Sequence, residues 1–293
     1  MTGPILAILA AIMFAGKAVL IRMAYASAPV DATTLVALRM AFSLPLCVAV
    51  LWWQRKLEPL SRRDWMTMLW LGFIGYYIAS FLDFWGLEYI SSALERILLF
   101  TYPTLVVLIS AALYGKRIGA REVIALLLTV VGTVVSFAND MRLASSTAAL
   151  WKGAFLVLGS AVAYAIFLIG SGRNVGRIGS LRFSALAISI ASGFVLAQFF
   201  ILRPVSTLVL PSKIYWLGLA LAWLCTGLPI FLTAEAIRRA GAGRVSIAGS
   251  IGPIVTIYLG HIFLGEAITV MQMVGAALVL GGVGLITVSG SDV

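Results

Sequence analysis

The chain consists of long apolar stretches separated by short polar connections. Ten of these stretches have roughly the 20 residues that a helix needs to cross the hydrocarbon core of a bilayer. They cover residues 4–25, 32–53, 65–86, 92–113, 120–138, 152–171, 181–202, 214–235, 244–264 and 269–289. Apolar and polar positions do not alternate within them, so the pattern favours helices over barrel strands. The sequence predicts an all-α integral membrane protein with ten transmembrane helices.

The second half of the chain echoes the first at an offset of 150 residues. Tyr102-Pro103 recurs as Gly252-Pro253, and Gly132 recurs as Gly282. The polar stretch 139–147 is the predicted junction, which divides the chain into five-helix repeats at 1–141 and 142–293. Because each repeat has an odd number of spans, we expect the two halves to be inverted. Such repeats are typical of transporters whose substrate site lies between the halves.

Composition and charge support a membrane protein with a defined orientation. The chain is 62% hydrophobic and 11% charged, with a mean hydropathy of +1.07, which leaves too little polar surface for a water-soluble globule. The connections after the second, fourth, sixth and eighth spans carry thirteen Lys and Arg residues, and the opposite connections carry six. This bias predicts that both termini are cytoplasmic. The net charge of +10 is therefore explained by the orientation of the chain in the membrane, and we expect no nucleic-acid partner.

The polar residues do not form a recognisable catalytic, metal-binding or cofactor-binding set. Every connection is short, so we expect no nucleotide-binding domain, no ATP-binding partner and no cofactor. Gly16-Lys17 lacks the glycine and the Ser/Thr of a phosphate-binding loop. Cys47 and Cys225 are interpreted as packing residues, and the single histidine, His261, as structural. We therefore expect a protein that is not an enzyme, since an intramembrane enzyme would need paired catalytic groups at matching depth.

Several short motifs, in order and in duplicate, resemble the EamA pattern of the drug/metabolite transporter (DMT) superfamily. In the first half they are Leu38-Arg39, Arg63-Asp64-Trp65, the stretch 87–93, Tyr102-Pro103 and Gly115, and in the second half Ala163-Tyr164, Gly252-Pro253, Leu264-Gly265-Glu266, Gln272 and Gly275. The resemblance covers nearly the whole chain and is greatest to the YddG-type exporters of aromatic and neutral amino acids. It implies an inner-membrane secondary transporter that exports amino acids or similar metabolites by alternating access. The chain departs from many members by having Phe14-Ala15-Gly16-Lys17 in place of Trp-Gly.

Lys17 and Arg39 are charged residues within predicted spans, where charge is costly and often functional. Lys17 would either face a central cavity and meet a substrate carboxylate, or form a structural pair with Asp83, Glu95 or Glu235. Arg39 is interpreted as a structural brace, because the second helix is expected to be peripheral to the cavity in this family.

Aromatic residues are candidates for the cavity wall. In the third span Tyr76 and Ser80, and likewise Tyr77, Phe81 and Phe84, follow spacings that place them on one helical face. The residues predicted to bind substrate are Phe14, Lys17, Tyr76, Tyr77, Ser80, Phe81, Phe100, Tyr102, Tyr164, Phe167 and Trp223. Each aromatic residue has the alternative of simple packing.

Two prolines and one charged pair are candidate gating residues. Pro103 and Pro253 occupy equivalent positions in the two repeats, where a proline frees a backbone carbonyl and bends a helix. Glu95 and Arg96 lie at the predicted outer start of the fourth span and would form either an outer gate or an interfacial ion pair.

The sequence leaves alternatives for the substrate and for its coupling. The expected partners are a small-molecule substrate and membrane lipid. Efflux of hydrophobic drugs or organic cations is the main alternative, but it would require an acidic cavity residue where this chain has Lys17. A passive channel would need a continuous polar stripe. No clear proton carrier is found, so uniport or exchange fits at least as well as proton antiport.

Overall fold

The computed structural model describes residues 3–54, 59–115, 118–241, 245 and 248–289. Over these residues the fold is all-helical, without strands. The α-helices are α1 (Gly3–Ser27), α2 (Ala32–Trp53), α3 (Arg62–Gly72), α4 (Ala79–Gly86), α5 (Ser92–Leu99), α6 (Tyr102–Tyr114), α7 (Ala120–Leu143), α8 (Thr147–Ile178), α9 (Ser180–Leu202), α10 (Ser212–Ala222), α11 (Leu228–Ala240), α13 (Gly252–Leu264) and α14 (Val270–Ser289). Two π-helical segments, η1 (Phe73–Ile78) and η3 (Trp223–Gly227), and a 3₁₀ turn, η2 (Val205–Leu208), complete the set.

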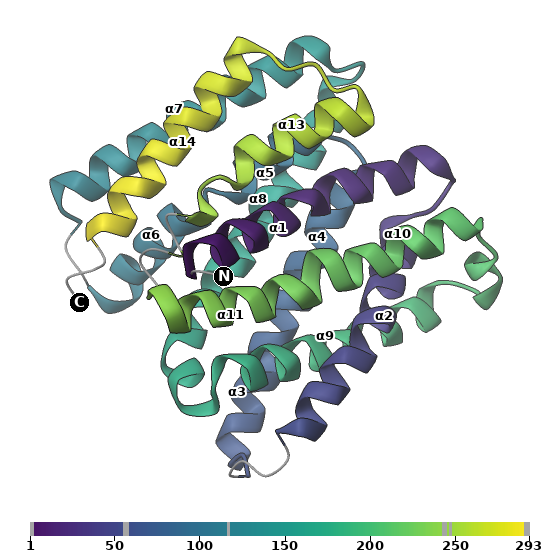
Figure 1. Ribbon diagram of the computed structural model, residues 1–293. Coiled ribbons are helices and arrows are strands. Elements are labelled where there is room, and N and C mark those ends of the chain that lie inside the picture. The colour runs from purple at the N-terminus through teal and green to yellow at the C-terminus, as the bar shows by residue number, and fades with distance from the viewer. Residues whose placement is uncertain (1–2, 55–58, 116–117, 242–244, 246–247, 290–293) are drawn as a thin grey trace.

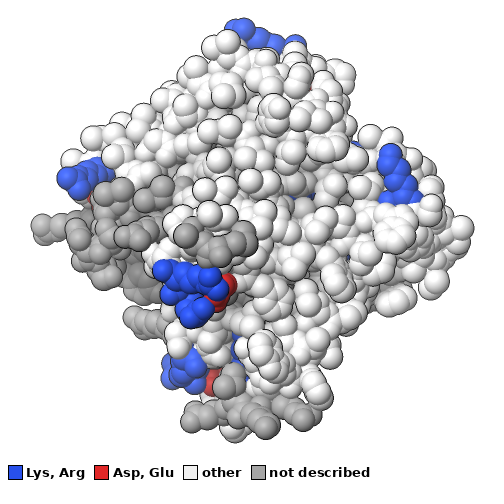
Figure 2. All heavy atoms as spheres, in the orientation of Figure 1, with Lys and Arg blue, Asp and Glu red and all other residues white. Residues whose placement is uncertain are grey.

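The surface and the helix lengths are those of a multi-pass membrane protein. Among the described residues, eight helical segments are long and apolar enough to cross a membrane, and Gly252–Leu264 and Val270–Ile286 form shorter apolar helices. Figure 2 shows a face on which charged side chains gather in small groups between broad uncharged areas. The prediction of ten inverted spans thus stays a prediction, because part of the ninth span lies outside the described residues.

The predicted third, fourth and eighth spans are composite. The third consists of α3, η1 and α4, and the eighth of α10, η3 and α11. The fourth is interrupted at Phe100 and Thr101, which separate α5 from α6. Pro103 accordingly lies in the first turn of α6, where a missing N–H costs nothing, instead of kinking a continuous helix. Pro253 has the same place in α13.

Local sequence explains where several of these helices begin and end. Ser61 begins α3 with a capping box, in which its hydroxyl and the Asp64 carboxylate each accept a backbone N–H. Ser91 caps α5 by accepting the N–H of Leu94 at 3.0 Å. The helices α6 and α13 both end at a left-handed glycine, Gly115 with φ +65° and Gly265 with φ +67°, a backbone conformation that favours glycine.

The 150-residue offset of the sequence recurs in the secondary structure. Helix α13 begins and ends 150 residues after α6 begins and ends, and the two π-helical segments, which begin at Phe73 and Trp223, also start 150 residues apart. The contacts between helices are related by the same offset. Helix α1 packs on α11 and α13, and its counterpart α8 packs on α4 and α6. The two counterparts α7 and α14 pack along each other, as do α2 and α9.

Figure 1 shows how these pairs are arranged. The helices α7 and α14 run side by side along one edge of the bundle, and α2 and α9 lie at the other. Helix α1 runs through the middle of the view between α13 and α11. The centre of the bundle is therefore bounded by elements from both halves of the chain.

The first part of the polar stretch 139–147, which is the predicted junction of the repeats, is helical. Asn139 and Asp140 belong to α7, which continues to Leu143, and both side chains are buried. The predicted boundary between residues 141 and 142 therefore falls in the last turn of this helix. Hydrogen bonds from Ser91 and Gln272 to Asp140, and from Thr269 to Asn139, allow these polar residues to be buried in a helix.

Candidate substrate cavity

A cavity of about 490 Å³ lies in the middle of the bundle. Its size is that of a small-molecule site. Ala7, Ala11, Phe14 and Lys17 line it on successive turns of α1, from near the start of that helix to its middle. Further lining residues come from α2, η1, α4, α5, α6, α8, η3, α11 and α14, together with Val245, Gly249, Ser250 and Gly252. The cavity thus extends from Lys17 toward the end of the bundle at which α1 begins.

Lys17 lies between two buried carboxylates. Its Nζ is 2.6 Å from Asp83 Oδ2 and 3.3 Å from Glu95 Oε1. Asp83 is on α4 and lines the cavity, whereas Glu95 is on α5, is fully buried and does not line it. Of the three carboxylates predicted as alternative partners, Asp83 and Glu95 are thus brought to Lys17. Glu235 instead pairs with Arg238 and Arg239 on α11.

Arg39 reaches the cavity from α2, although the sequence suggested that this helix is peripheral. Its Nη2 donates a hydrogen bond to Ser80 Oγ at 2.9 Å, and its guanidinium carbon lies 5.0 Å from the centre of the Phe84 ring. The Nε atom is buried and has no hydrogen-bond partner among the described residues. The side chain therefore braces α2 against α4 and also lines the cavity with its charge.

Arg96 contributes a third cation at the point where α5 meets α13. Its Nε donates to Thr256 Oγ1 at 3.2 Å, and the Thr256 hydroxyl donates to the Ala15 carbonyl at 2.9 Å. Its guanidinium group also lies over the Phe100 ring, 5.6 Å from the ring centre. Among the acidic side chains that the structure describes, none forms an ion pair with Arg96 or with Arg39. The predicted pair of Glu95 with Arg96 does not form.

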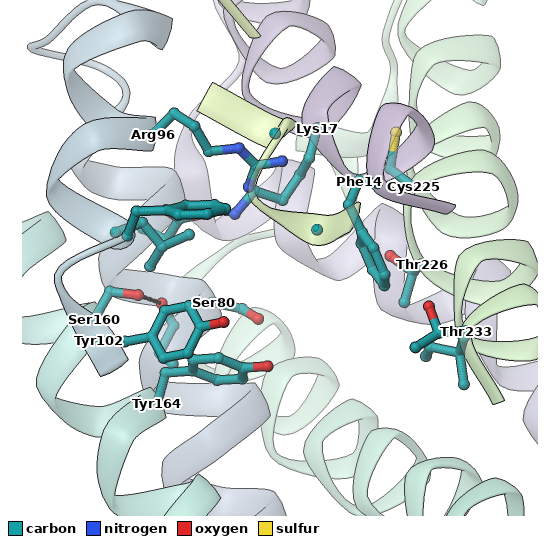
Figure 3. A pocket seen from close by; sticks show the side chains of 18 of the residues that line it. Phe14, Lys17, Ser80, Arg96, Tyr102, Ser160, Tyr164, Cys225, Thr226 and Thr233 are labelled. Atoms are coloured by element: carbon teal, nitrogen blue, oxygen red, sulfur yellow. Dashed lines mark hydrogen bonds and ion pairs between the residues drawn. The ribbon is translucent and has the colours of Figure 1, made fainter. Parts of the chain in front are cut away.

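One wall of the cavity is aromatic. Tyr102 on α6 and Tyr164 on α8 meet edge to face with their ring centres 5.0 Å apart, and both line the cavity. Figure 3 shows this pair on one side and Thr226 and Thr233 on the other, with Arg96 and Lys17 at the top of the view. Phe14, Tyr76, Ser80 and Phe100 also line the cavity, as predicted for substrate-binding residues.

Four of the predicted substrate-binding residues do not line the cavity. Tyr77 packs with Phe73 and Phe194, and Phe81 packs against Trp85. Phe167 is buried beneath Tyr76 and Tyr164, where it supports the aromatic wall. Trp223 is 44% exposed, and its indole N–H donates to the Phe42 carbonyl at 3.1 Å.

The candidate gating residues are also separated in space. Pro103 lines the cavity, whereas Pro253 is buried and does not. Arg96 lines it, whereas Glu95 does not and instead lies 3.3 Å from Lys17 Nζ through its Oε1.

Several cavity residues were not among the predicted ones. They are small or weakly polar: Ser160, Cys225, Thr226 and Thr233. Cys225 had been interpreted as packing. Thr226 lies 150 residues after Tyr76 and Thr233 lies 150 residues after Asp83, so the internal repeat was the signal that could have found these two.

A network of polar residues closes the bundle at the end away from the start of α1. We call Ser91, Ser92, Asn139, Asp140, Glu266, Thr269 and Gln272 the polar junction. The Glu266 carboxylate accepts the Ser92 N–H at 3.0 Å and the Ser92 hydroxyl at 2.6 Å. Arg22 approaches the same carboxylate at 3.9 Å. The junction thus ties the start of α5 in the first half to the connection between α13 and α14 in the second.

No metal-binding site is present in the part of the chain that the structure describes. No group of three or more His, Cys, Asp or Glu side chains there could hold a metal ion. His261 is exposed, and its Nδ1 lies 2.9 Å from the Glu266 carbonyl oxygen.

Comparison with known proteins identifies relatives over nearly the whole chain. The profile of the "EamA-like transporter family" matches twice, at residues 1–138 and 151–288. The uncharacterized transporter YcbK of Bacillus subtilis is 29% identical over 285 residues, which cover 93% of this chain and 88% of that protein. The uncharacterized inner membrane transporter YicL of Salmonella typhimurium is 26% identical over 78% of this chain and 74% of its own.

Two further matches extend this picture. An uncharacterized transporter of Archaeoglobus fulgidus is 24% identical over 86% of each chain. One crystal structure superimposes with a TM-score of 0.67 and covers 99% of this chain and 98% of the other, at 18% identity. At that identity, the structural match supports the fold alone.

Proposed function

Since the chain belongs to the EamA-like transporter family, we propose that it exports zwitterionic metabolites, foremost amino acids with an apolar or aromatic side chain, across the inner membrane by alternating access. It is a membrane transporter by family, and we assign it no enzymatic activity. The substrate, the direction and the mechanism are our inference from the cavity.

One observation carries the substrate class: Arg39 and Arg96 face the cavity without a carboxylate partner among the described side chains. A guanidinium group can bind a carboxylate through two parallel hydrogen bonds, and such bonds are strong in a site shielded from water. Lys17 is already held by Asp83 and Glu95. We therefore assign the substrate carboxylate to the arginines, and Lys17 to holding the two acids.

The ends of two helices favour the same ligand. Tyr102 and Pro103 at the start of α6 line the cavity, and so does Gly252 at the start of α13. Interrupted helices that begin at a central site are typical of transporters, in which the positive end of the helix dipole faces an anionic group. The substrate carboxylate would lie near these helix starts and Arg96.

The aromatic wall supports an apolar substrate side chain. Tyr102, Tyr164 and Phe100 offer ring faces and edges to the cavity, and Phe167 supports them from behind. Contacts between aromatic rings contribute about 0.5–1.5 kcal/mol beyond burial of their area. These features agree with the sequence resemblance to the YddG-type exporters, which remains part of our proposal.

The repeated architecture supports alternating access. The proposed halves, 1–141 and 142–293, have counterpart elements that make counterpart contacts. The polar junction holds the two halves together at one end, whereas the cavity extends toward the other. Rocking one half against the other would break the junction and expose the cavity on that side. If the chain has ten spans and cytoplasmic termini, as we propose, the cavity is open toward the cytoplasm.

Efflux of hydrophobic cations is the second candidate, and the cavity charge disfavours it. Asp83 is an acid on the cavity wall, but Lys17 pairs with it at 2.6 Å. With Lys17, Arg39 and Arg96 against Asp83 and Glu95, the ionised groups carry a net charge of +1. A cation would enter this site against repulsion.

Transport by purified protein in liposomes tests the proposal. The assay measures counterflow of labelled phenylalanine, tyrosine, leucine and threonine, with phenethylamine, which lacks the carboxylate, as a competitor. We expect saturable phenylalanine counterflow that phenethylamine does not inhibit, and a rise in KM of about tenfold or more in Arg96→Gln and Arg39→Gln.

Arg142→Gln is the matched control, because Arg142 is exposed near the end of α7. Its KM should equal that of the wild type, and gel filtration should show that all variants are folded. No counterflow of any amino acid, or strong inhibition by phenethylamine, would refute the proposed substrate class.

A further inference from the structure

The cluster of Asp83, Lys17 and Glu95 contains one more carboxylate than its single ammonium group can neutralise. Lys17 Nζ donates a hydrogen bond to Asp83 Oδ2 at 2.6 Å, but its 3.3 Å approach to Glu95 Oε1 forms only an ion pair. Neither Glu95 oxygen, nor Asp83 Oδ1, accepts a hydrogen bond from an amide, hydroxyl or cationic group that the structure describes. The carboxyl groups of Asp83 and Glu95 lie within hydrogen-bonding reach of each other, so they can share a proton. A buried carboxylate without hydrogen bonds is stable in its neutral form, so the cluster has room for one proton.

Two arginines make the cavity as a whole positive, but among the charged and titratable groups that the structure describes around the two acids, only Lys17 forms an ion pair with either of them. The other groups are Arg39 from α2, Arg96 from α5, Tyr25 from α1, Tyr76 from η1, Tyr102 from α6, Tyr164 from α8 and Cys225 from η3. Arg39 donates to Ser80, Arg96 donates to Thr256, and the Tyr25 hydroxyl donates to the Phe84 carbonyl. Helix α13, which packs on α5, contributes the neutral Thr256. The arginines thus provide a long-range positive field without a hydrogen bond to either acid.

The position of the two acids provides a route for the proton. Asp83 lines the cavity, whereas Glu95 is fully buried, does not line it and lies next to Asp83 and Lys17. Water in the cavity can therefore reach Asp83, and through it the pair.

We propose that Asp83, Lys17 and Glu95 bind one exchangeable proton in competition with the ammonium group of a zwitterionic substrate, which makes the protein a proton/substrate antiporter. This inference rests on the proposed function. A proton from cavity water adds to a carboxylate oxygen of the cluster and forms a neutral carboxyl group. When a substrate binds with its carboxylate at the arginines, its ammonium group takes up the excess negative charge, and the proton returns to water.

Competition of this kind produces exchange, because the site carries either the proton or the substrate in each crossing. Occupancy by one excludes the other, so a pH gradient drives the substrate toward the acidic side. One pH unit corresponds to about 1.4 kcal/mol and supports at most about tenfold accumulation for one-to-one exchange.

The test uses the full-length protein in liposomes and labelled L-phenylalanine as the probe. Counterflow without a gradient measures transport itself, and accumulation into an acidic lumen measures coupling. In wild-type protein we expect several-fold accumulation into an acidic lumen, none into an alkaline one, and release of lumenal protons to a pH-sensitive dye when phenylalanine is added outside. In Glu95→Gln we expect accumulation to be lost while counterflow remains measurable.

Glu88→Gln is the matched control, since Glu88 is a half-buried carboxylate outside the cluster that accepts the Ala32 N–H at 2.9 Å. It should accumulate phenylalanine as wild type does. Wild-type counterflow without proton movement or pH-driven accumulation, or accumulation into an alkaline lumen, would overturn the antiport while leaving the proposed function intact. Absence of counterflow for every amino acid of the panel would instead overturn the proposed function. The proton signal of the wild type decides the question even if Glu95→Gln fails to fold.

Discussion

Gly132 on α7 and Gly275 on α14 lie so close that a Cβ atom added to Gly132 would be 2.6 Å from the Gly275 carbonyl oxygen. The same contact recurs under the 150-residue offset, because a Cβ on Gly282 would lie 2.6 Å from the Ala125 carbonyl oxygen. Close approach of two helix backbones through small residues is a common way to join helices in membranes. The two contacts are related by the 150-residue offset, so α7 and α14 pack on each other through equivalent positions.

Substitution of these glycines tests that packing. We expect Gly132→Ala and Gly282→Ala each to lower the free energy of unfolding by about 1–3 kcal/mol, because the backbones must separate to admit the methyl group. Gly284→Ala is the control on the same helix, since its Cβ would meet nothing within 4 Å. Thermal unfolding in detergent measures the effect. Equal shifts for all three variants would mean that the close approach contributes nothing specific.

Lys17 is predicted to be essential for stability as well as for coupling. Replacement by methionine leaves two buried carboxylates without their cation, and removal of one partner from a buried pair costs about 3–5 kcal/mol. Lys213→Met is the control, because Lys213 is exposed in the first turn of α10. Unfolding by titration with SDS compares the two variants.

A companion variant separates charge from packing at the same site. Lys17→Met combined with Glu95→Gln removes one of the two stranded charges, so it should recover part of the lost stability. A double variant as unstable as Lys17→Met would show that the loss arises from packing of the lysine stem.

The polar junction is predicted to limit access to the cavity from the side on which Glu266 lies. Glu266→Ala removes the acceptor of both Ser92 hydrogen bonds and should favour the conformation open on that side. In a Cys47→Ser background, Cys225 on the cavity wall reports this opening. We expect a membrane-impermeant maleimide added to whole cells to label Cys225 several-fold faster in Glu266→Ala.

Glu122→Ala is the control for this experiment, because Glu122 lies in the first turn of α7, away from the junction. It should label at the wild-type rate. If Glu266→Ala labels no faster, or labels faster only when the reagent is added from the cytoplasmic side, the junction does not close that end.

The pair of Asp31 and Arg203 is predicted to stabilise the fold in a pH-dependent way. Burial raises the pKa of the Asp31 carboxyl, but hydrogen bonds from Thr34 and from Arg203, at 2.7 Å for Nη2, outweigh it and hold the pKa below its ordinary value of 3.8. A lower pKa in the folded state gives stabilisation that is complete above the ordinary value and is lost as pH falls through the folded one. Asp31→Asn should therefore lower the unfolding temperature at about pH 7 and make little difference below about pH 3.

The pKa of Glu88 is shifted in the opposite direction to that of Asp31, so Glu88→Gln is the comparison for Asp31→Asn. Partial burial and the nearby Asp31 charge raise the pKa of its carboxyl above the ordinary 4.5. Ionisation of Glu88 thus opposes folding as pH rises above that value, so Glu88→Gln should not lower the unfolding temperature at about pH 7. The Asp31 prediction is contradicted if Asp31→Asn shows the same loss across the whole pH range.

The features that could be predicted from sequence are those that depend on local composition and on the internal repeat. Apolar length fixed the helical spans, and eight of them are found as helices long enough to cross a membrane. The offset that relates Pro103 to Pro253 also relates the starts of the helices that contain them. The family assignment from the paired motifs is confirmed by two profile matches, at 1–138 and 151–288.

The site itself could be predicted only in part. Phe14, Tyr76, Tyr102 and Tyr164 line the cavity, but Trp223 does not, because mean hydropathy and span limits do not say which face of a helix points inward. Side-chain direction in a membrane helix depends on its neighbours, since lipid and protein interior are almost equally apolar. For the same reason Arg39, on a helix expected to be peripheral, could not be recognised as a cavity residue.

The sequence by itself determined that this chain is a repeated, helical membrane transporter, because apolar length, charge bias and internal duplication are properties of consecutive residues. The partners of its buried charges were decided only by the tertiary structure. Lys17 could have faced the substrate or paired with any of three acids, and it lies between Asp83 and Glu95 because α4 and α5 both reach the middle of α1. The strength of an ion pair depends on the distance between its charges in space. Asp83 is 66 residues from Lys17 along the chain, so only the folded structure shows that the two meet.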